Sequence, residues 1–203
     1  MHKKCFKTAK GGYTIIETMI SLSIFLVIII SGTGALLNVN RLHQKSQDMR
    51  SIMDNLSFIM EDISRNLRTG SNYRCMGSFS VTQIDEPRSC ASGGALAFEY
   101  TFGNKLSSAD QGVYKIESTD GGVTYNLSRS VSSGSAGSWS QLNPPEVVLS
   151  SISGFSVLGA EAPPGDSQQP LVIIKLVGTV TYHGVVSPFS IQTSVSQRLV
   201  DLE

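Results

Sequence analysis

Residues that could carry catalytic or metal chemistry are few in this chain, and their spacing matches no catalytic motif. The three histidines, His2, His43 and His183, have no sequence neighbour that suggests a catalytic triad, and no G-x-S-x-G elbow is present. A phosphate-binding loop, an H-E-x-x-H zinc motif and a D-x-D-x-D calcium loop are also absent. We therefore expect no enzyme activity, no catalytic residues, no metal site and no cofactor.

One acidic residue, Glu17, lies near the start of a long apolar run, GGYTIIETMISLSIFLVIII. No charged residue occurs from Thr18 to Asn40, and about 20 such residues span a bilayer as a helix. A charge at the bilayer centre costs roughly 2.5–3.5 kcal/mol or more, so an acid within the membrane needs a partner. Two interpretations remain open: Glu17 pairs with a cation in apolar surroundings, or it reaches the polar interface.

A short basic stretch precedes the apolar run. Residues 1–12 contain four lysines and no acid, which predicts a cytoplasmic N-terminus and an outer location for the chain after Arg41. Without residues 1–12, 12 basic and 16 acidic residues remain, a net charge of −4. A chain of this sign has no global attraction for nucleic acid, whose binding depends on neutralising phosphates.

Two alternatives for the N-terminal segment remain open. An ordinary secretory signal needs an A-x-A-like cleavage site, for which Thr33-Gly34-Ala35 is a poor match, and its basic region would contain Glu17. An uncleaved simple anchor would keep Met1. In both alternatives, as in a membrane-spanning helix, a single apolar segment enters the membrane.

The cysteines predict one disulfide. Cys5 lies in the basic stretch, so Cys75 and Cys90 are an even pair on the outer side of the membrane, where disulfides persist. A bridge between them closes a 16-residue loop and contributes about 3 kcal/mol in the chain-entropy model. Two free thiols or a metal site are the alternatives, although no C-x-x-C spacing is present and the nearest histidine, His43, lies on the expected helix.

Helical periodicity continues beyond the apolar run. Apolar residues recur at spacings of three and four: Val39, Leu42, Met49, Ile52, Met53, Leu56, Ile59, Met60, Ile63 and Leu67. We expect one helix from about Thr14 to Thr69, roughly 80 Å long, with an apolar half and an amphipathic half that ends at Gly70. A coiled coil is the alternative for the amphipathic half, but packing on the chain's own sheet is favoured. Gly32 and Gly34 mark either a close-packing surface or a point where the helix loosens.

After Gly70 the apolar period changes to two, which indicates strands. The expected strands cover residues 96–102, 113–117, 123–127, 172–182 and 189–199. The ragged apolar segment 146–158 is expected to be a strand with a break at Ser153-Gly154. Turns are expected at 118–122 and 183–184, and the Gly-, Ser- or Pro-rich stretches 130–145 and 159–170 are expected to be loops. We therefore predict an α+β fold in which one long N-terminal helix packs on an antiparallel β-sheet domain.

The residues from Gly11 to Ile20, GGYTIIETMI, resemble the class III leader and first helix of type IV pilins and pseudopilins. In that family a short basic leader ends in glycine, the mature chain begins with an aromatic residue, here Tyr13, and a glutamate follows four positions later, here Glu17. The resemblance implies that prepilin peptidase cuts between Gly12 and Tyr13 and that the new amine of Tyr13 is methylated. It also implies that Glu17 pairs with the Tyr13 amine of a neighbouring subunit.

Near its C-terminal end the chain resembles a subgroup of this family. Residues 189–198, FSIQTSVSQR, are similar to the last strand of W-type minor pilins and J-type pseudopilins, and Asn66-Leu67-Arg68 before a loop also fits them. Those subunits belong to small tip complexes of pili or of type II secretion pseudopili. The sequence ends soon after this strand, without the C-terminal disulfide-closed loop usual in major pilins, so a minor subunit is expected. The match covers about residues 8–30 well and the last strand loosely.

The resemblance implies four parts: a cleaved leader (1–12), a transmembrane and filament-core helix (13–40), an amphipathic helix half (41–70) and an extracytoplasmic β-rich head (71–203). The expected function is a minor pilin or pseudopilin subunit that prepilin peptidase processes and methylates. Its expected partners are the membrane and other pilins or pseudopilins, bound through the N-terminal helix. We expect a single pass in the cytoplasmic membrane, and later a filament at the cell surface or in the periplasm. The alternative is a membrane-anchored binding or adhesion domain that joins no filament.

Overall fold

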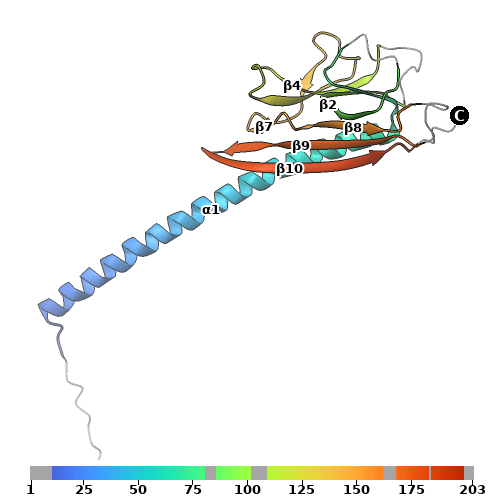
Figure 1. Ribbon diagram of the computed structural model, residues 1–203. Helices are drawn as coiled ribbons and strands as arrows, with labels where there is room; N and C mark the ends of the chain where they lie inside the picture. Colours follow the sequence, from blue (N-terminus) through green and yellow to red (C-terminus); the bar gives the residue numbers. More distant parts are fainter. Residues whose placement is uncertain (1–10, 81–85, 102–108, 162–167, 183, 199–203) are drawn as a thin grey trace, which may run out of the picture. The chain divides into compact units, whose positions relative to one another are not determined.

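The computed structural model of the chain describes residues 11–80, 86–101, 109–161, 168–182 and 184–198. The chain forms two compact units, Met1–Gln47 and Asp48–Glu203, which are described separately. Helix α1 (Ile15–Thr69) contributes its apolar half to the first unit and most of its amphipathic half to the second (Figure 1). One long helix followed by an antiparallel β domain confirms the predicted α+β fold.

Helix α1 begins and ends close to the predicted residues. The Glu17 N–H donates a hydrogen bond to the Thr14 Oγ1 atom at 3.3 Å, which makes Thr14 the N-cap. At the other end the Gly70 N–H donates to the Asn66 carbonyl at 3.0 Å. A Cβ atom at Gly70 would lie 2.6 Å from a ring carbon of Phe98, so the helix ends where close packing requires glycine.

Ten strands follow in the described part of the chain, and all belong to one sheet (Figure 1). They are β1 (Ser71–Met76), β2 (Cys90–Gly93), β3 (Ala95–Glu99), β4 (Gly112–Ser118), β5 (Tyr125–Ser130), β6 (Ser140–Gln141), β7 (Val147–Leu149), β8 (Gly154–Leu158), β9 (Leu171–Tyr182) and β10 (Val185–Ser196). The hydrogen-bonded order is β1-β3-β4-β5-β7-β9-β8-β2, with β6 on β5 and β10 on β9. Strand β9 is therefore central, because it pairs with β7 and β8 along one edge and with β10 along the other.

The two end strands of this order meet. Arg74 in β1 and Arg88, just before β2, form a parallel bridge. The Cys75 N–H donates to the Arg88 carbonyl, and the Arg88 N–H donates to the Tyr73 carbonyl, both at 2.9 Å. This contact joins the first and last strands of the path, so the sheet has no long free edge at that point.

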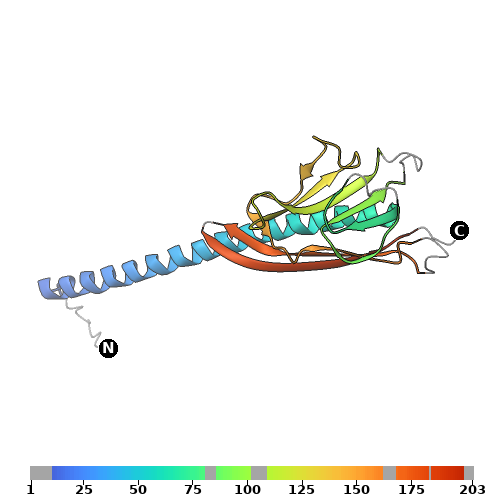
Figure 2. The same ribbon diagram turned by 45° about the horizontal axis from the view of Figure 1, so that its top comes forward.

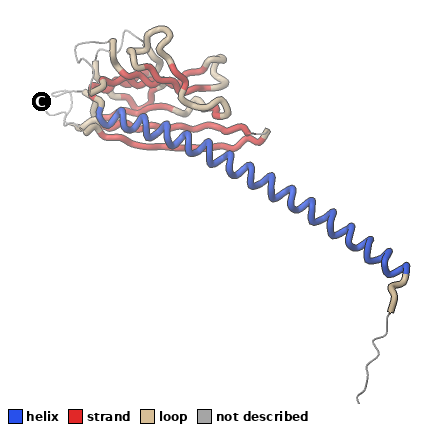
Figure 3. Tube along the Cα trace, turned by 180° about the vertical axis from the view of Figure 1, so that it is seen from behind, coloured by secondary structure: helices blue, strands red, loops and turns tan. Residues whose placement is uncertain are grey.

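The hydrophobic core of the second unit lies between α1 and the sheet. Six helix residues are buried: Ile52, Leu56, Ile59, Met60, Ile63 and Leu67. They pack in one cluster with buried strand residues that include Phe98, Tyr114, Leu176 and Val195. Figure 3 shows this part of the helix running along the strands. Since burying a side chain of this size contributes about 1.5–3 kcal/mol, this face holds the helix on the sheet.

Polar contacts also fix the helix to the sheet. The Arg129 Nη1 atom in β5 lies 3.1 Å from Asp62 Oδ2 on the helix, and Arg129 Nη2 donates to the Tyr100 hydroxyl at 3.1 Å. The Asn66 side-chain N–H donates to the Tyr114 hydroxyl at 3.0 Å. Burial raises the pKa of Tyr114, so its phenol stays neutral next to this charged pair.

The structure corrects parts of the predicted sheet. The pattern predicted none of β1, β2 and β6, and β6 lies in the expected loop 130–145. The segment 146–158 was expected to be one strand with a break at Ser153-Gly154; it forms two strands, β7 and β8, separated at residues 150–153. Strand β3 was expected to alternate, but all its side chains are buried, because a second apolar cluster with Trp139 and Phe79 covers its other face. Residues 102, 183 and 199, which the prediction placed in strands or a turn, lie outside the described residues.

Candidate functional site

The first unit places the predicted cleavage residues at the start of α1. Residues 11–14 precede the helix without regular structure, and the Tyr13 side chain is 83% exposed. A Cβ atom added at Gly12 would meet nothing within 4 Å. The Gly12–Tyr13 peptide bond therefore lies in an exposed, non-helical segment, the kind of segment that proteases cleave most readily. Residues 1–10 of the predicted leader lie outside the described residues.

The apolar half of α1 is exposed throughout its own unit. Its large apolar side chains from Ile15 to Leu37 are 45–82% exposed. The helix is long and apolar enough near its N-terminus to span a membrane, by length and composition. A contiguous apolar surface of this size is unfavourable in water.

Four hydroxyl groups in the apolar half donate hydrogen bonds to carbonyl groups of the helix itself. The donors and their backbone acceptors are Thr18 to Ile15 at 2.8 Å, Ser23 to Ile20 at 2.8 Å, Ser31 to Val27 at 2.7 Å and Thr33 to Ile29 at 2.7 Å. Such bonds lower the cost of placing a hydroxyl in hydrocarbon. Glu17 differs, because none of the described Lys, Arg or His side chains forms an ion pair with its carboxylate.

Glu17 lies in a shallow groove on one face of the helix. The other lining residues are Tyr13, Thr18, Ser21, Leu22 and Phe25. The groove is mostly apolar, so the carboxylate is presented on an apolar surface next to the predicted new N-terminus. The Thr14-x-x-Glu17 spacing also fits a capping box, of which the Glu17 N–H bond to Thr14 is the threonine half. A cation supplied by a second molecule would find Glu17 accessible.

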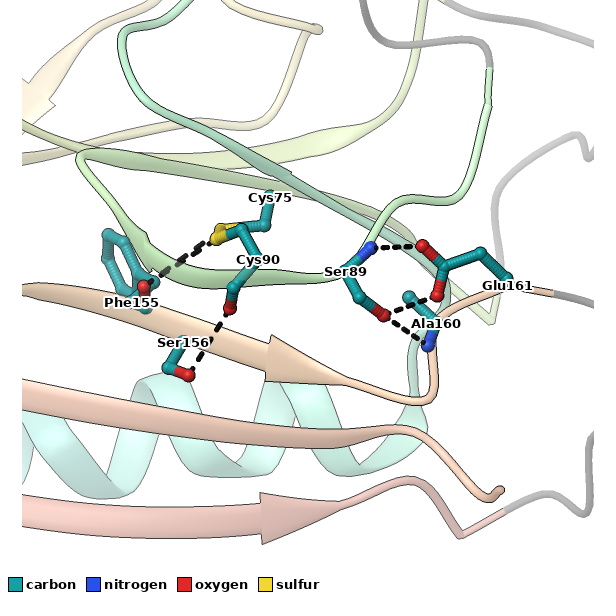
Figure 4. Close-up of a disulfide and its surroundings, with 7 residues drawn as sticks. All are labelled: Cys75, Ser89, Cys90, Phe155, Ser156, Ala160 and Glu161. Atoms are coloured by element: carbon teal, nitrogen blue, oxygen red, sulfur yellow. Dashed lines mark hydrogen bonds between the residues drawn. A yellow bond between two sulfur atoms is a disulfide. The ribbon is translucent and has the colours of Figure 1, made fainter. Parts of the chain in front are cut away.

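The second predicted site is the cysteine pair. Cys75 of β1 and Cys90 of β2 form a disulfide, with Cα atoms 5.7 Å apart, within the usual range. Figure 4 shows the bridge against Phe155 of β8, whose carbonyl oxygen lies 3.9 Å from both sulfur atoms. The bridge lies where the first and last strands of the sheet meet, so it reinforces that contact covalently.

A carboxylate anchors the chain next to the disulfide (Figure 4). The Ser89 N–H donates to Glu161 at 2.8 Å, and the Ser89 hydroxyl donates to the other carboxylate oxygen. The Ser89 hydroxyl oxygen accepts from the Ala160 N–H at 3.0 Å. The Ser89 hydrogen bonds hold the pKa of Glu161 below its usual range, so the anchor is ionised at neutral pH. No sequence pattern indicates this contact, because the two residues are 72 positions apart.

Other titratable residues form no comparable site in the described part of the chain. No three His, Cys, Asp or Glu side chains of the described residues come close enough together to hold a metal ion. His43 is exposed on α1, and the other two histidines lie outside the described residues. A cleft of about 220 Å³ brings Asp48, Glu146 and Tyr182 together in the second unit.

The disulfide prediction is thus confirmed, whereas cleavage after Gly12, methylation of Tyr13 and pairing of Glu17 remain predictions. The structure adds that these three residues share one exposed, accessible region at the start of an apolar helix. Neither a protein-family model, nor a curated protein, nor a solved structure matches the chain.

Proposed function

We propose that this chain is a minor pilin or pseudopilin. Prepilin peptidase cleaves it after Gly12, its new N-terminal residue Tyr13 is methylated, and it enters a type IV pilus or a type II secretion pseudopilus, at a position that primes or caps the filament. One observation carries the proposal. A carboxylate, Glu17, stands on an exposed apolar helix four residues after Tyr13, which directly follows Gly12.

Cleavage creates the cation that Glu17 lacks. The α-amino group of Tyr13 has an ordinary pKa near 7.7–8.0, so it is largely protonated at neutral pH. When apolar helix halves pack together, the amine of one subunit meets the carboxylate of a neighbour in surroundings that screen charge poorly. Both charges are costly in hydrocarbon unless they pair, so the pair sets how far one helix is displaced along the next. Processing therefore comes before assembly and is required for it.

The same apolar half serves two environments in turn. Before assembly it spans the cytoplasmic membrane once, with the N-terminus inside and the β domain outside. An outer location agrees with the disulfide between Cys75 and Cys90, which persists in an oxidising compartment. In the filament the apolar side chains pack against those of neighbouring helices. The partners are the prepilin peptidase/methyltransferase and other pilins or pseudopilins.

The proposal is tested by replacing Glu17 and measuring how much of the chain enters sheared filament fractions. Glu17→Ala removes the charge from an exposed helix position, so insertion in the membrane and folding of the β domain should be unchanged. Incorporation should fall by about tenfold or more, the effect of losing a buried charge partner. Glu17→Gln keeps the size and hydrogen-bonding capacity but loses the charge, so it should also be defective.

Ser21→Ala is the matched control, because Ser21 lines the same groove one turn further along the helix and is uncharged. It should enter filaments as wild type does. Formation of the Cys75–Cys90 disulfide in every variant would show that the β domain still folds. Normal incorporation of both Glu17 variants would contradict the proposal.

A further inference from the structure

The described sheet leaves one long edge without a partner. The order β1-β3-β4-β5-β7-β9-β8-β2 is joined at its ends by the Arg74–Arg88 bridge and the disulfide. Strand β10, 12 residues long, pairs with β9 alone in the part of the chain that the structure describes. Figures 1 and 2 show it at the outer border of the sheet. A strand in this position presents a row of unpaired N–H and C=O groups.

The register identifies which backbone groups of β10 face outward. On β9, the Val177 carbonyl accepts a hydrogen bond from the Ser150 N–H, and the Thr181 N–H donates one to the Glu146 carbonyl. The backbone groups of odd-numbered β9 residues therefore point away from β10. The backbone groups of even-numbered β9 residues therefore face β10. Because Val185 pairs with Tyr182, the even-numbered residues of β9 pair with odd-numbered residues of β10, whose backbone groups face β9. The outward groups then belong to the even-numbered residues of β10: Val186, Pro188, Ser190, Gln192, Ser194 and Ser196.

The even-numbered side chains lie on the solvent face of β10, since all six residues are exposed. The position of the proline agrees with the assignment of the backbone groups. Pro188 has no N–H to donate, and it occupies a position whose N–H would face solvent, where a strand tolerates proline. Strand β10 contains no charged residue, although natural edge strands commonly use charge to prevent pairing. The part from Ser190 to Ser196 therefore has an intact, unprotected outer edge.

We propose that the outer edge of β10 from Ser190 to Ser196 binds an extended segment of another polypeptide by strand addition. Phe189 and Ile191, on the helix side of β10, are only half-buried at this edge, so an added strand would cover them with apolar side chains. On the opposite side the added strand would lie next to Ser190, Gln192 and Ser194, which suit uncharged polar residues. The partner segment thus alternates apolar and uncharged polar residues.

The direction of the helix argues for a different polypeptide as the partner. The Arg198 N–H donates to the Arg68 carbonyl at 2.9 Å, and Tyr182 lines the same cleft as Asp48, so β10 runs in the same direction as residues 48–69 of α1. Two copies joined antiparallel through β10 would have their α1 segments entering the β domains from opposite ends. If both chains are anchored in one membrane by their N-terminal segments, as proposed above, residues 48–69 of the two chains would have to lead toward that membrane in opposite directions, which favours a different polypeptide as the partner.

The test uses the full chain in detergent micelles and a labelled synthetic peptide, TVSVQVSVT, which has the required alternation and is not a copy of β10 or of any other segment of the chain. Fluorescence anisotropy should show saturable binding. Two further peptides carry backbone N-methyl groups on alternate residues, one on the odd set and one on the even set. Because an added strand uses only one of its edges, one set should weaken binding by at least about tenfold and the other by less than about twofold. Equal effects of the two sets, or no binding of the parent peptide, would overturn the proposal.

Variants of the chain test the same edge from the other side. Gln192→Pro removes one outward N–H, as Pro188 already does, and should weaken binding by about tenfold, whereas Gln192→Ala should bind as wild type. Pro188→Ser restores an outward N–H and should strengthen binding. If Gln192→Pro lowers the thermal stability of the β domain, Gln192→Lys replaces it as the blocking variant. Equal binding by Gln192→Ala and the blocking variant contradicts the proposal, as does a dimer of wild type that forms through β10 in micelles.

Discussion

The absence of a side chain at Gly93 lets the end of β2 pack closely against Cys75 and the backbone of β1. A Cβ atom there would lie 2.5 Å from Cys75 Sγ and 2.6 Å from the Met76 carbonyl oxygen. Neither atom can move freely, because the sulfur is bonded to Cys90 and the carbonyl belongs to β1. The contact that joins the first and last strands of the sheet therefore depends on the absence of a side chain at this residue.

Gly93→Ala should lower the free energy of unfolding by about 1–3 kcal/mol, the cost of adding a methyl group to a packed site. Gly77→Ala is the control, because a Cβ atom there meets nothing within 4 Å, and it should cost less than about 0.5 kcal/mol. Urea unfolding of the full chain in detergent would measure both through Trp139, the only tryptophan. Equal losses of unfolding free energy in the two variants would show that the close packing around Gly93 does not exclude a side chain there.

Asp120 stabilises the turn between β4 and β5 through its negative charge. Its carboxylate accepts hydrogen bonds from the Thr124 N–H at 2.8 Å and from the Thr124 hydroxyl at 2.6 Å. The Ser118 hydroxyl donates to it at 2.8 Å. These bonds lower the pKa of Asp120 from 3.8 to about 2. Because the pKa is lower in the folded state, the stabilisation is present above about pH 4 and is lost as the pH falls through about 2.

Asp120→Asn should therefore lower the melting temperature of the β domain at pH 6, and the difference from wild type should close by about pH 2. Circular dichroism melts at several pH values would measure it. Thr124→Val removes the main hydrogen-bond donor and should reduce the pH dependence of wild type in the same range. A difference between Asp120→Asn and wild type that is the same at both pH values would exclude the charge as the cause.

At the scale of elements, α1 is one helix with two kinds of surface. Its first half is apolar on all sides and exposed in its own unit, and its second half buries one stripe against the sheet. The stripe begins at Ile52, later than the sequence pattern indicated, because Val39 and Leu42 are exposed in the first unit. Those two residues therefore extend the surface that other helices or lipid must cover.

Leu56 and Phe58 provide a matched pair for testing how the helix is held. Leu56 is 1% exposed and Phe58 is 72% exposed. Leu56→Ala should lower the free energy of unfolding by about 2–5 kcal/mol through the cavity it leaves. Phe58→Ala should have an effect of less than about 0.5 kcal/mol, since alanine is the better helix former. The urea experiment measures both, and a large loss in Phe58→Ala would mean that the helix packs on the sheet through another face.

At the scale of the whole molecule, the helix and the hairpins could be predicted because their signals are local. The apolar period of three and four residues predicts α1, and alternation predicts β4 and the β9–β10 hairpin. Strands β1 and β2 could not be found in this way. The last four residues of β1 are all buried and show no alternation, and β2, CASG, is only four residues long and has no large apolar side chain. Their pairing depends on contacts distant in sequence, including the Ser89–Glu161 anchor.

The apolar period also could not predict how the loop at residues 130–145 is held in place. It is held by side-chain bonds: Asn143 accepts from the Leu127 N–H at 2.8 Å and donates to the Val147 carbonyl at 2.8 Å. Asn143 thus takes the place of a neighbouring strand for both groups. Gly12, Tyr13 and Glu17, which we propose as functional residues, stand out in the sequence by their spacing, and only the family resemblance suggests a partner for Glu17. A single chain does not contain the cation that assembly would supply.

The central claim is that the chain is processed between Gly12 and Tyr13. The most direct measurement is mass spectrometry of the N-terminal peptide of the protein extracted from membranes, in wild type and in Gly12→Val. Gly12→Val suits this purpose because a side chain at that position meets nothing in the chain itself. We expect wild type to begin with methylated Tyr13 and Gly12→Val to keep its leader, about 1.3 kDa of additional mass for 12 residues. A wild-type chain that begins at Met1, or near Leu36 as after ordinary signal cleavage, would contradict it.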